Sequence, residues 1–151
     1  MIKRMKYTSR QLCDVGPDEL SEIAKTSRRN NERDDLTGLL VKVGEYFFQI
    51  LEGPPEAVDA TYERIRLDRR HGDIVVVGSP ELVDARLFGE WSMRVESLDP
   101  ESEQRLEPIG HMLRTVVELV EKSVEMTAVL QRSLLRELKT RPSVAPPPDA
   151  S

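Results

Sequence analysis

The stretch TGLLVKVGEYFFQILEG, residues 37–53, decides the fold. Two runs rich in apolar, β-branched and aromatic residues flank Gly44-Glu45, and a glycine here suits a two-residue hairpin turn. The pattern predicts antiparallel strands over residues 37–43 and 46–52. Because side chains alternate along a strand, each strand presents one set of residues to the core and another to the opposite face.

A helix is predicted on either side of this hairpin. Gly16-Pro17-Asp18-Glu19 is typical of a helix start, because proline fits the first turn and acidic side chains suit the helix dipole. This helix runs to about residue 31, and steps of three and four residues place one stripe on a single face: Leu20, Ile23, Ser27 and Asn31. Gly53-Pro54-Pro55-Glu56 opens the second helix, which ends within residues 69–73.

Three further strands are predicted outside this unit. Residues 2–9 form the first strand, with Met5, Tyr7 and Ser9 on one face. Residues 74–78 are a continuous apolar run, which is typical of a buried strand. A loop then leads to a last strand over residues 91–95.

Alternation along this last strand places Trp91, Met93 and Val95 inward and Ser92 and Arg94 outward. The complete order is β-α-β-β-α-β-β, which contains a split β-α-β unit. We therefore expect a ferredoxin-like α+β sandwich with a C-terminal helical extension and both early helices on one face of the sheet.

Residues 108–139 form an amphipathic helical region, in which apolar residues recur at helical spacing: Ile109, Leu113, Val116, Val120, Val124, Leu130, Leu134 and Leu138. This stripe must be buried against the uncovered face of the sheet or against a second subunit. Residues 141–151 contain four prolines, so a disordered tail is expected. The expected division is 1–98 for the sensor domain described below, 99–140 for the helical extension and 141–151 for the tail.

The composition excludes several classes of protein. A chain of 151 residues suits one domain, and a net charge of −5 argues against a general nucleic-acid binder. One cysteine, Cys13, and two histidines make both a disulfide framework and a zinc site improbable, so no metal is expected. No apolar stretch approaches the roughly 20 residues that span a bilayer, and no signal peptide is expected. A cytoplasmic, soluble protein without a membrane partner is predicted.

Gln49 is the most informative residue, because it shares a strand face with Phe47 and Leu51. An unsatisfied amide there costs roughly 1–3 kcal/mol, so Gln49 requires partners, and Tyr7, Ser27 and Asn31 point toward the same space. A hydrogen-bonded core network is the simplest explanation. Four polar side chains between two helices and a sheet also suggest a planar, polar ligand.

Two other clusters have ordinary structural explanations. Asp68-Arg69-Arg70-His71 lies near a helix C-terminus, where basic residues complement the dipole, and spacing alone favours this explanation over a phosphate site. Alternation explains Trp91 and Met93 as core residues.

An ordered series of short motifs nevertheless carries a family resemblance: Tyr7-Thr8-Ser9, Thr26-Ser27-Arg28-Arg29-Asn30-Asn31, Leu36-Thr37-Gly38-Leu39-Leu40, Phe47-Phe48-Gln49-Ile50-Leu51-Glu52-Gly53, Asp68-Arg69-Arg70-His71, Arg86-Leu87-Phe88 and Trp91-Ser92-Met93. Over residues 2–97 the chain resembles the BLUF family of blue-light sensors, which bind a flavin, usually FAD. FMN and riboflavin are also possible cofactors, because the recognisable contacts are to the flavin ring that all three share. The family fold agrees with the fold predicted from periodicity.

The resemblance implies a role for each matching residue. Tyr7 is expected to donate an electron and a proton to the photoexcited flavin, with Gln49 between them. Asn31 is expected to hydrogen-bond the ring, and the other expected flavin contacts are Ile23, Ser27, Leu40, Phe47, Leu51, Asp68, Arg70 and His71. Trp91 or Met93 is expected to relay the signal, and the sequence does not decide which of them faces the ring.

The resemblance also implies a function. Transfer from Tyr7 triggers rotation or tautomerisation of Gln49, and the signal leaves through the last strand and the C-terminal helices. No enzymatic domain is recognised, so the chain resembles stand-alone members that act through homo-oligomers and a downstream signalling protein, without direct nucleic-acid binding.

Three competing functions come from other classes. An RNA-recognition module shares the element order, but the charge and the low aromatic content disfavour it. A small enzyme that binds an acyl phosphate lacks a nucleophile with an adjacent base. A flavin-dependent redox protein requires an open face on the ring, whereas two covering helices are predicted here.

Overall fold

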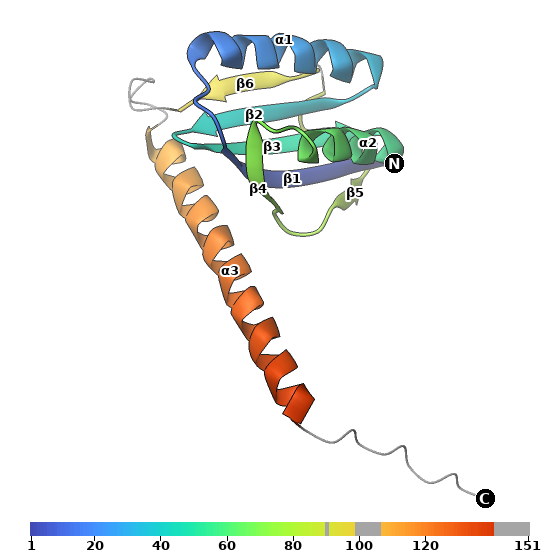
Figure 1. Ribbon diagram of the computed structural model, residues 1–151. Helices are drawn as coiled ribbons and strands as arrows, with labels where there is room; N and C mark the ends of the chain where they lie inside the picture. The colour runs from blue at the N-terminus through green and yellow to red at the C-terminus, as the bar shows by residue number, and fades with distance from the viewer. Residues whose placement is uncertain (90, 99–106, 141–151) are drawn as a thin grey trace, which may run out of the picture. The chain divides into compact units, whose positions relative to one another are not determined.

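The computed structural model describes residues 1–89, 91–98 and 107–140. Its elements follow the order β1 (Ile2–Gln11), α1 (Pro17–Arg33), β2 (Thr37–Val43), β3 (Tyr46–Gly53), α2 (Pro55–Arg66), β4 (His71–Val76), β5 (Glu81–Val83), β6 (Arg94–Ser97) and α3 (Glu107–Thr140) (Figure 1). The predicted disordered tail, residues 141–151, lies outside the described residues.

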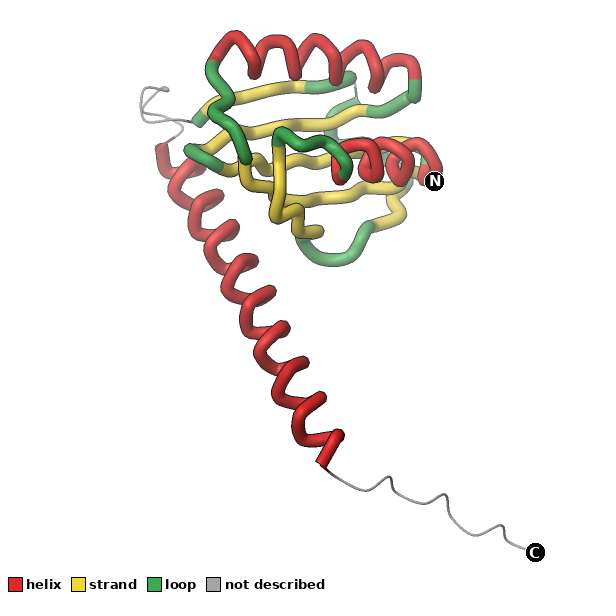
Figure 2. The backbone as a smooth tube through the Cα atoms, viewed as in Figure 1, coloured by secondary structure: helices red, strands yellow, loops and turns green. Residues whose placement is uncertain are grey.

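The strands form one sheet in the order β4-β1-β3-β2-β6, with β5 paired to β1 beside this row. β3 lies between β1 and β2 and pairs antiparallel with both, whereas β6 runs parallel to β2. Helices α1 and α2 cover the same face of the sheet (Figures 1 and 2). The predicted ferredoxin-like α+β sandwich is confirmed.

The predicted hairpin forms β2 and β3, and its turn has Gly44 at φ 57°, a conformation that glycine adopts without steric cost. The register places Tyr7 opposite Gln49 on β3 and Leu40 opposite Gln49 from the other side. Residues directly opposite each other share a face, so these three side chains form a row across the middle of the sheet.

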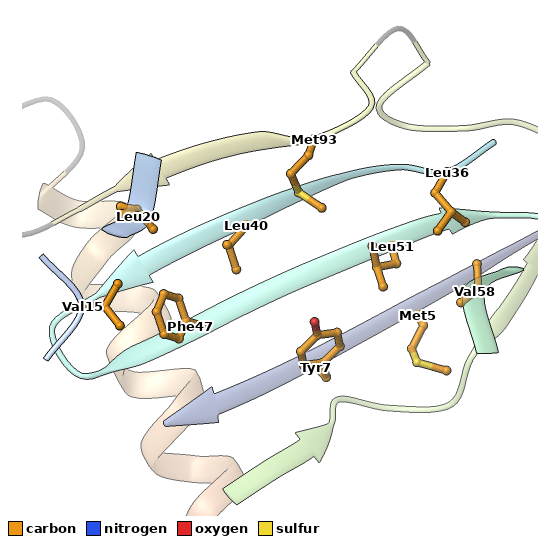
Figure 3. Close-up of a cluster of buried hydrophobic side chains, with 10 residues drawn as sticks. All are labelled: Met5, Tyr7, Val15, Leu20, Leu36, Leu40, Phe47, Leu51, Val58 and Met93. Atoms are coloured by element: carbon orange, nitrogen blue, oxygen red, sulfur yellow. The ribbon is translucent and has the colours of Figure 1, made fainter. Parts of the chain in front are cut away.

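The apolar core fills the space between this row and the two helices. Ten buried residues form the cluster in Figure 3: Met5, Tyr7, Val15, Leu20, Leu36, Leu40, Phe47, Leu51, Val58 and Met93. Leu20 comes from α1 and Val58 from α2, so this cluster packs both helices onto the sheet. A second cluster on the other face contains Val41, Val43 and Leu98, with Leu113 packed against it.

The chain forms two compact units, residues 1–117 and 118–151. In the first unit, Leu113 of the predicted stripe is half-buried, whereas Ile109 and Val116 are exposed; the buried Val117 lies beside the stripe. Farther along the stripe, Val120 is half-buried and Val124, Leu130 and Leu134 are exposed. The sensor-domain boundary at residue 98 stays a prediction.

The last strand is shorter than predicted, because β6 begins at Arg94 and not at Trp91. The backbone carbonyls before it take other partners: that of Trp91 accepts from the Gly38 amide, and that of Ser92 from the side chain of Asn31. Strand alternation therefore does not reach Trp91. Its side chain is 45% exposed, contrary to the inward prediction, whereas Met93 is 3% exposed as predicted.

Other elements also differ from prediction. β4 begins three residues early, at His71, and is only half-buried because it lies at the edge of the row and not inside the sheet. β5 falls within a predicted loop, since three residues are too few to show a period. α2 ends at Arg66, so residues 68–70 form a turn and not the end of a helix.

A buried ion pair fixes the segment that connects β5 to β6. Glu52 is fully buried at the end of β3, and its Oε1 accepts from Arg4 Nε at 2.6 Å. The same carboxylate accepts the backbone amides of Leu87 and Phe88 at 2.9–3.1 Å. Phe88 in turn stacks on Trp91, with 6.3 Å between ring centroids. The Arg86-Leu87-Phe88 motif is thus the anchor of this segment.

Replacing Glu52 by alanine tests this anchor. The change leaves the Arg4 charge and two amides without their carboxylate, so we expect the free energy of unfolding to fall by about 3 kcal/mol. Urea denaturation followed by circular dichroism measures it. The control is Glu22→Ala, which removes an exposed pair with Lys25 and should cost about 0.5 kcal/mol or less. Equal effects of the two substitutions would contradict the anchoring role.

Candidate functional site

Tyr7 and Gln49 form a hydrogen-bonded pair at the centre of the helix-covered face. Both side chains are buried, at 1% and 6% exposure, and the Tyr7 hydroxyl donates to Gln49 Oε1. Figure 3 shows the hydroxyl directed from β1 toward β3. The predicted partnership is therefore present. Because Oε1 faces Tyr7, the amide Nε2 of Gln49 is left to donate elsewhere.

The environment keeps Tyr7 protonated. Burial, followed by the nearby Tyr62, raises the pKa of Tyr7 well above its usual value of 10.0. The rings of Tyr7 and Tyr62 meet edge to face, with centroids 5.5 Å apart. The hydroxyl therefore holds its proton at neutral pH.

A small polar cavity lies beside this pair, between α1 and α2. Its volume is about 150 Å³, and its lining includes Gln49 from β3 and Met93 from the segment before β6. α1 contributes Thr26, Ser27, Asn30 and Asn31, and α2 contributes Thr61, Arg64 and Ile65; Asp68 and Arg70 come from the turn after α2. Six of the predicted residues meet here: Ser27, Asn31, Gln49, Asp68, Arg70 and Met93.

The other predicted residues surround this cavity or lie apart from it. Tyr7, Leu40, Phe47 and Leu51 belong to the core cluster with Met93, and Ile23 packs against that cluster. His71 lies farther along, where its ring meets Phe47 edge to face at 5.8 Å and its Nδ1 is 3.4 Å from the Ser9 hydroxyl. Trp91 does not line the cavity and is exposed.

Asn31 and Arg28 hold the segment before β6 against α1. Asn31 is buried, and its Nδ2 donates to the Ser92 carbonyl at 2.6 Å. Arg28 Nε donates to the Met93 carbonyl at 2.9 Å. Two side chains from one helix thus attach the backbone carbonyls of Ser92 and Met93 to α1.

The Asp68-Arg70 pair closes the other end of the cavity. Arg70 Nη2 donates to Asp68 Oδ2 at 2.6 Å, and this hydrogen bond lowers the pKa of Asp68 below its usual value. Burial lowers the pKa of His71 below 6.5, which favours its neutral form at pH 7. The guanidinium of Arg70 is thus engaged with Asp68.

Sequence reasoning missed several lining residues, chiefly Thr61, Arg64 and Ile65 of α2. Thr61 and Ile65 are four residues apart, so they share one face of α2. A polar threonine on a helix face that packs against the sheet was the one sequence signal that could have identified these lining residues. Arg64 is held in place by Thr61 Oγ1 at 2.7 Å and Asp34 Oδ2 at 3.0 Å.

The residues present fit a flavin ring in chemistry. The amide groups of Gln49 and Asn31, with the hydroxyls of Ser27 and Thr61, provide donors and acceptors at the edge of a planar heterocycle. A cavity of 150 Å³ is smaller than the roughly 300 Å³ at the lower end of ligand sites. A second hollow of about 630 Å³ lies under the first half of α1, against Lys42, Val95 and Ser97. Part of the inner face of α1 is therefore not in close contact with the sheet.

Within the part of the chain that the structure describes, no cluster of three or more histidine, cysteine, aspartate or glutamate side chains is suited to hold a metal ion. Among the described helices, none is long and apolar enough to cross a membrane.

Known proteins share this sequence pattern. Residues 2–94, more than half of the chain, match the BLUF family, described as sensors of blue-light using FAD. The beta subunit of a photoactivated adenylate cyclase from Euglena gracilis is 36% identical over 92 residues, 61% of this chain and 11% of that protein. The blue light- and temperature-regulated antirepressor BluF from Escherichia coli (strain K12) is 35% identical over 98 residues, 65% of this chain and 24% of BluF. The chain thus spans a quarter or less of these relatives.

Solved structures share the fold as well. A bacterial light-regulated adenylyl cyclase matches with a TM-score of 0.74 and 35% identity, over 83% of this chain and 36% of the cyclase chain. BlrB, a BLUF protein in its dark state, matches with a TM-score of 0.66 and 29% identity, over 90% of this chain and 96% of the BlrB chain. With its family match over residues 2–94 and this shared fold, the chain belongs to the BLUF family of blue-light sensors.

Proposed function

We propose that this protein is a blue-light receptor that holds FAD, without a covalent bond, between α1 and α2. The observation that carries the proposal is the buried hydrogen bond from Tyr7 to Gln49 beside a polar cavity. Gln49 Nε2 and the Asn31 side chain hold the ring edge, and Ile23, Ser27, Leu40, Phe47, Leu51, Asp68, Arg70 and His71 surround it. FAD is chosen over FMN or riboflavin because the family description names it.

Bound flavin supplies the absorption of blue light and an excited state that takes up an electron and a proton. Tyr7 is the residue that gives up both, because its high pKa keeps the proton on the hydroxyl in the dark. The hydrogen bond gives that proton a defined exit, since the hydroxyl already points at Gln49 Oε1. Burial excludes water, which would otherwise compete for the hydrogen bond.

Gln49 is the switch. Its amide carries an acceptor at one end and two donors at the other, so a half-turn of the side chain reverses every hydrogen bond that it makes. In the reversed state, Nε2 donates to the Tyr7 oxygen and Oε1 faces the cavity; tautomerisation of the amide gives a related exchange. The two states differ in one hydrogen-bond pattern and define a bistable local element.

Met93 relays this change. It lines the cavity together with Gln49, belongs to the buried core, and its backbone carbonyl is held by Arg28. A shift of Met93 therefore acts on α1 and on β6, the strand that precedes α3. The exposed Trp91, stacked between Phe88 and the guanidinium of Arg94, has a secondary role.

The output goes to another protein and not to a reaction catalysed by this domain. The antirepressor and the cyclase subunits among the relatives carry light regulation in their names, which supports signalling through an effector. We assign residues 1–98 to the sensor domain and 99–140 to the output extension, which assembles a homo-oligomer in the cytoplasm.

The variant Tyr7→Phe tests the donor role. We expect it to bind flavin but to lose the reversible red shift of flavin absorption under blue light, because the transferable proton is gone. The matched control is Tyr62→Phe, which removes a neighbouring hydroxyl and should keep the shift. Light-minus-dark absorption spectra of both variants measure the shift. A normal photocycle in Tyr7→Phe would reject Tyr7 as the donor.

The variant Gln49→Leu tests the switch. Leucine keeps the apolar bulk and removes the reversible amide, so the coloured, folded protein should show no red shift. Loss of flavin from this variant would make Gln49 a binding residue more than a switch. The flavin-to-protein absorbance ratio separates these two results.

A third comparison tests the relay. Met93→Ala should keep the visible red shift but lose most of the light-induced infrared change of backbone carbonyls, because the buried side chain no longer couples Gln49 to the Ser92-Met93 backbone. Trp91→Ala should keep both signals. Light-minus-dark infrared spectroscopy measures the carbonyl change, and the opposite ranking of the two variants would assign the relay to Trp91.

A further inference from the structure

The hollow under the first half of α1, called here the α1 hollow, is distinct from the cavity beside Gln49. Its volume is about 630 Å³, within the range of roughly 300–1,000 Å³ that ligand sites occupy. α1 lines the hollow with Leu20 and Ala24. It lines the cavity with Ser27 and Asn31, and the two linings share no described residue. Another part of the hollow is formed by β6, which α1 follows in Figure 1. The α1 hollow is therefore separate from the site proposed for flavin.

A lysine lines the α1 hollow from the helix-covered face of the sheet. Lys42 lies two residues after Leu40 on β2 and opposite Phe47 of β3, so it shares the face of these two core residues. On its other side Lys42 lies opposite Ser97 of β6, which also lines the hollow. The lysine is half-buried. An inward position on this strand thus brings a positive charge to the wall of the hollow.

Arg28 brings a second positive charge to the α1 hollow. Its Nε donates to the Met93 carbonyl at 2.9 Å, and within the described part of the chain it forms no salt bridge. Lys25 also lines the hollow, but it is paired with Glu22 at 2.6 Å. Asp14 is the acidic residue of the described lining. The lining is therefore positive overall, in a chain whose net charge is −5.

The rest of the wall of the α1 hollow is largely apolar. Val15, Leu20 and Ala24 are buried and Val95 is half-buried, and all four line the hollow. Two cationic side chains beside such a wall suit a ligand with an anionic head and an apolar body, since the polar groups fix the orientation and the apolar contacts provide buried area.

We propose that the α1 hollow binds an organic carboxylate with an apolar chain, a ligand other than flavin. The carboxylate lies between Lys42 and Arg28, whose two Nη groups are suited to a carboxylate, and the chain lies along the wall of Val15, Leu20 and Ala24. A single negative charge is favoured over the double charge of a phosphate ester, because Asp14 belongs to the same lining.

Calorimetric titration of the full-length protein with sodium octanoate, in the dark and with FAD present, tests this site. We expect one octanoate per chain. Each methylene group that is buried contributes about fourfold to the affinity, so hexanoate should bind about fifteenfold more weakly. Octylammonium, which has the same chain and the opposite charge, and inorganic phosphate, which has no apolar body, should both bind far more weakly than octanoate.

Substitution of the two cationic residues locates the ligand. Lys42→Met keeps the length of the side chain and removes its charge, and Arg28→Gln removes the other charge; each should raise the octanoate dissociation constant about tenfold. Lys42→Arg keeps the charge and should retain binding. The matched control is Lys122→Met, at an exposed lysine of α3 outside the hollow, which should leave the constant unchanged. Circular dichroism verifies that each variant is folded.

Four results would overturn the proposal. Absence of octanoate binding at millimolar concentration rejects the site, and an unchanged dissociation constant in both Lys42→Met and Arg28→Gln places the ligand elsewhere. Equal affinities for octanoate, hexanoate and phosphate show a bare anion site without an apolar part. Release of flavin by octanoate, seen in the visible absorption spectrum, assigns the ligand to the flavin cavity.

These measurements do not depend on the light reaction. The dissociation constants are determined in the dark, and the red shift under blue light is recorded separately on the same protein. A normal red shift without octanoate binding rejects the carboxylate site alone, whereas octanoate binding without a red shift rejects the receptor function alone.

Discussion

The structure depends on one buried hydrogen bond, from the Tyr7 hydroxyl to Gln49 Oε1, across the middle of the sheet. Each group is costly to bury alone, so the strand register that places Tyr7 opposite Gln49 is also the register that satisfies them. The remaining donors of the Gln49 amide lie beside a cavity that is lined by both covering helices. A bond that is strong in a dry site and reversible by a half-turn is suited to a two-state switch.

Hydrogen bonds at the periphery of the site attach the segment around Met93 to its neighbours. Asn31 and Arg28 attach α1 to the carbonyls of Ser92 and Met93, and Glu52 anchors the segment before them through the amides of Leu87 and Phe88. The backbone near Met93 is therefore held at defined points on both sides. In the proposed mechanism, a shift of the Met93 side chain would act on α1 and on β6 through these points.

The sequence predicted the central hairpin, the row of Tyr7 and Gln49, and the polar end of the first helix, because each follows from a strict period of two or 3.6. The sequence-based prediction was wrong where a side chain, and not a neighbouring strand, forms the hydrogen bond to a backbone carbonyl. Trp91 follows the period of the last strand, yet the Ser92 carbonyl accepts a hydrogen bond from Asn31 and the strand begins only at Arg94. Similarly, no local pattern shows that Arg64 reaches the cavity, since its position depends on Asp34, thirty residues away.

The central claim is that light reorganises a hydrogen bond beside a flavin held by this chain. Its most direct measurement is the absorption spectrum of the purified, flavin-loaded protein in the dark, after blue illumination and during recovery. The account predicts a small red shift that decays in the dark, because the reversed Gln49 amide alters hydrogen bonding without bleaching the chromophore. A protein that cannot be loaded with flavin, or a flavin that bleaches without a red shift, would contradict it.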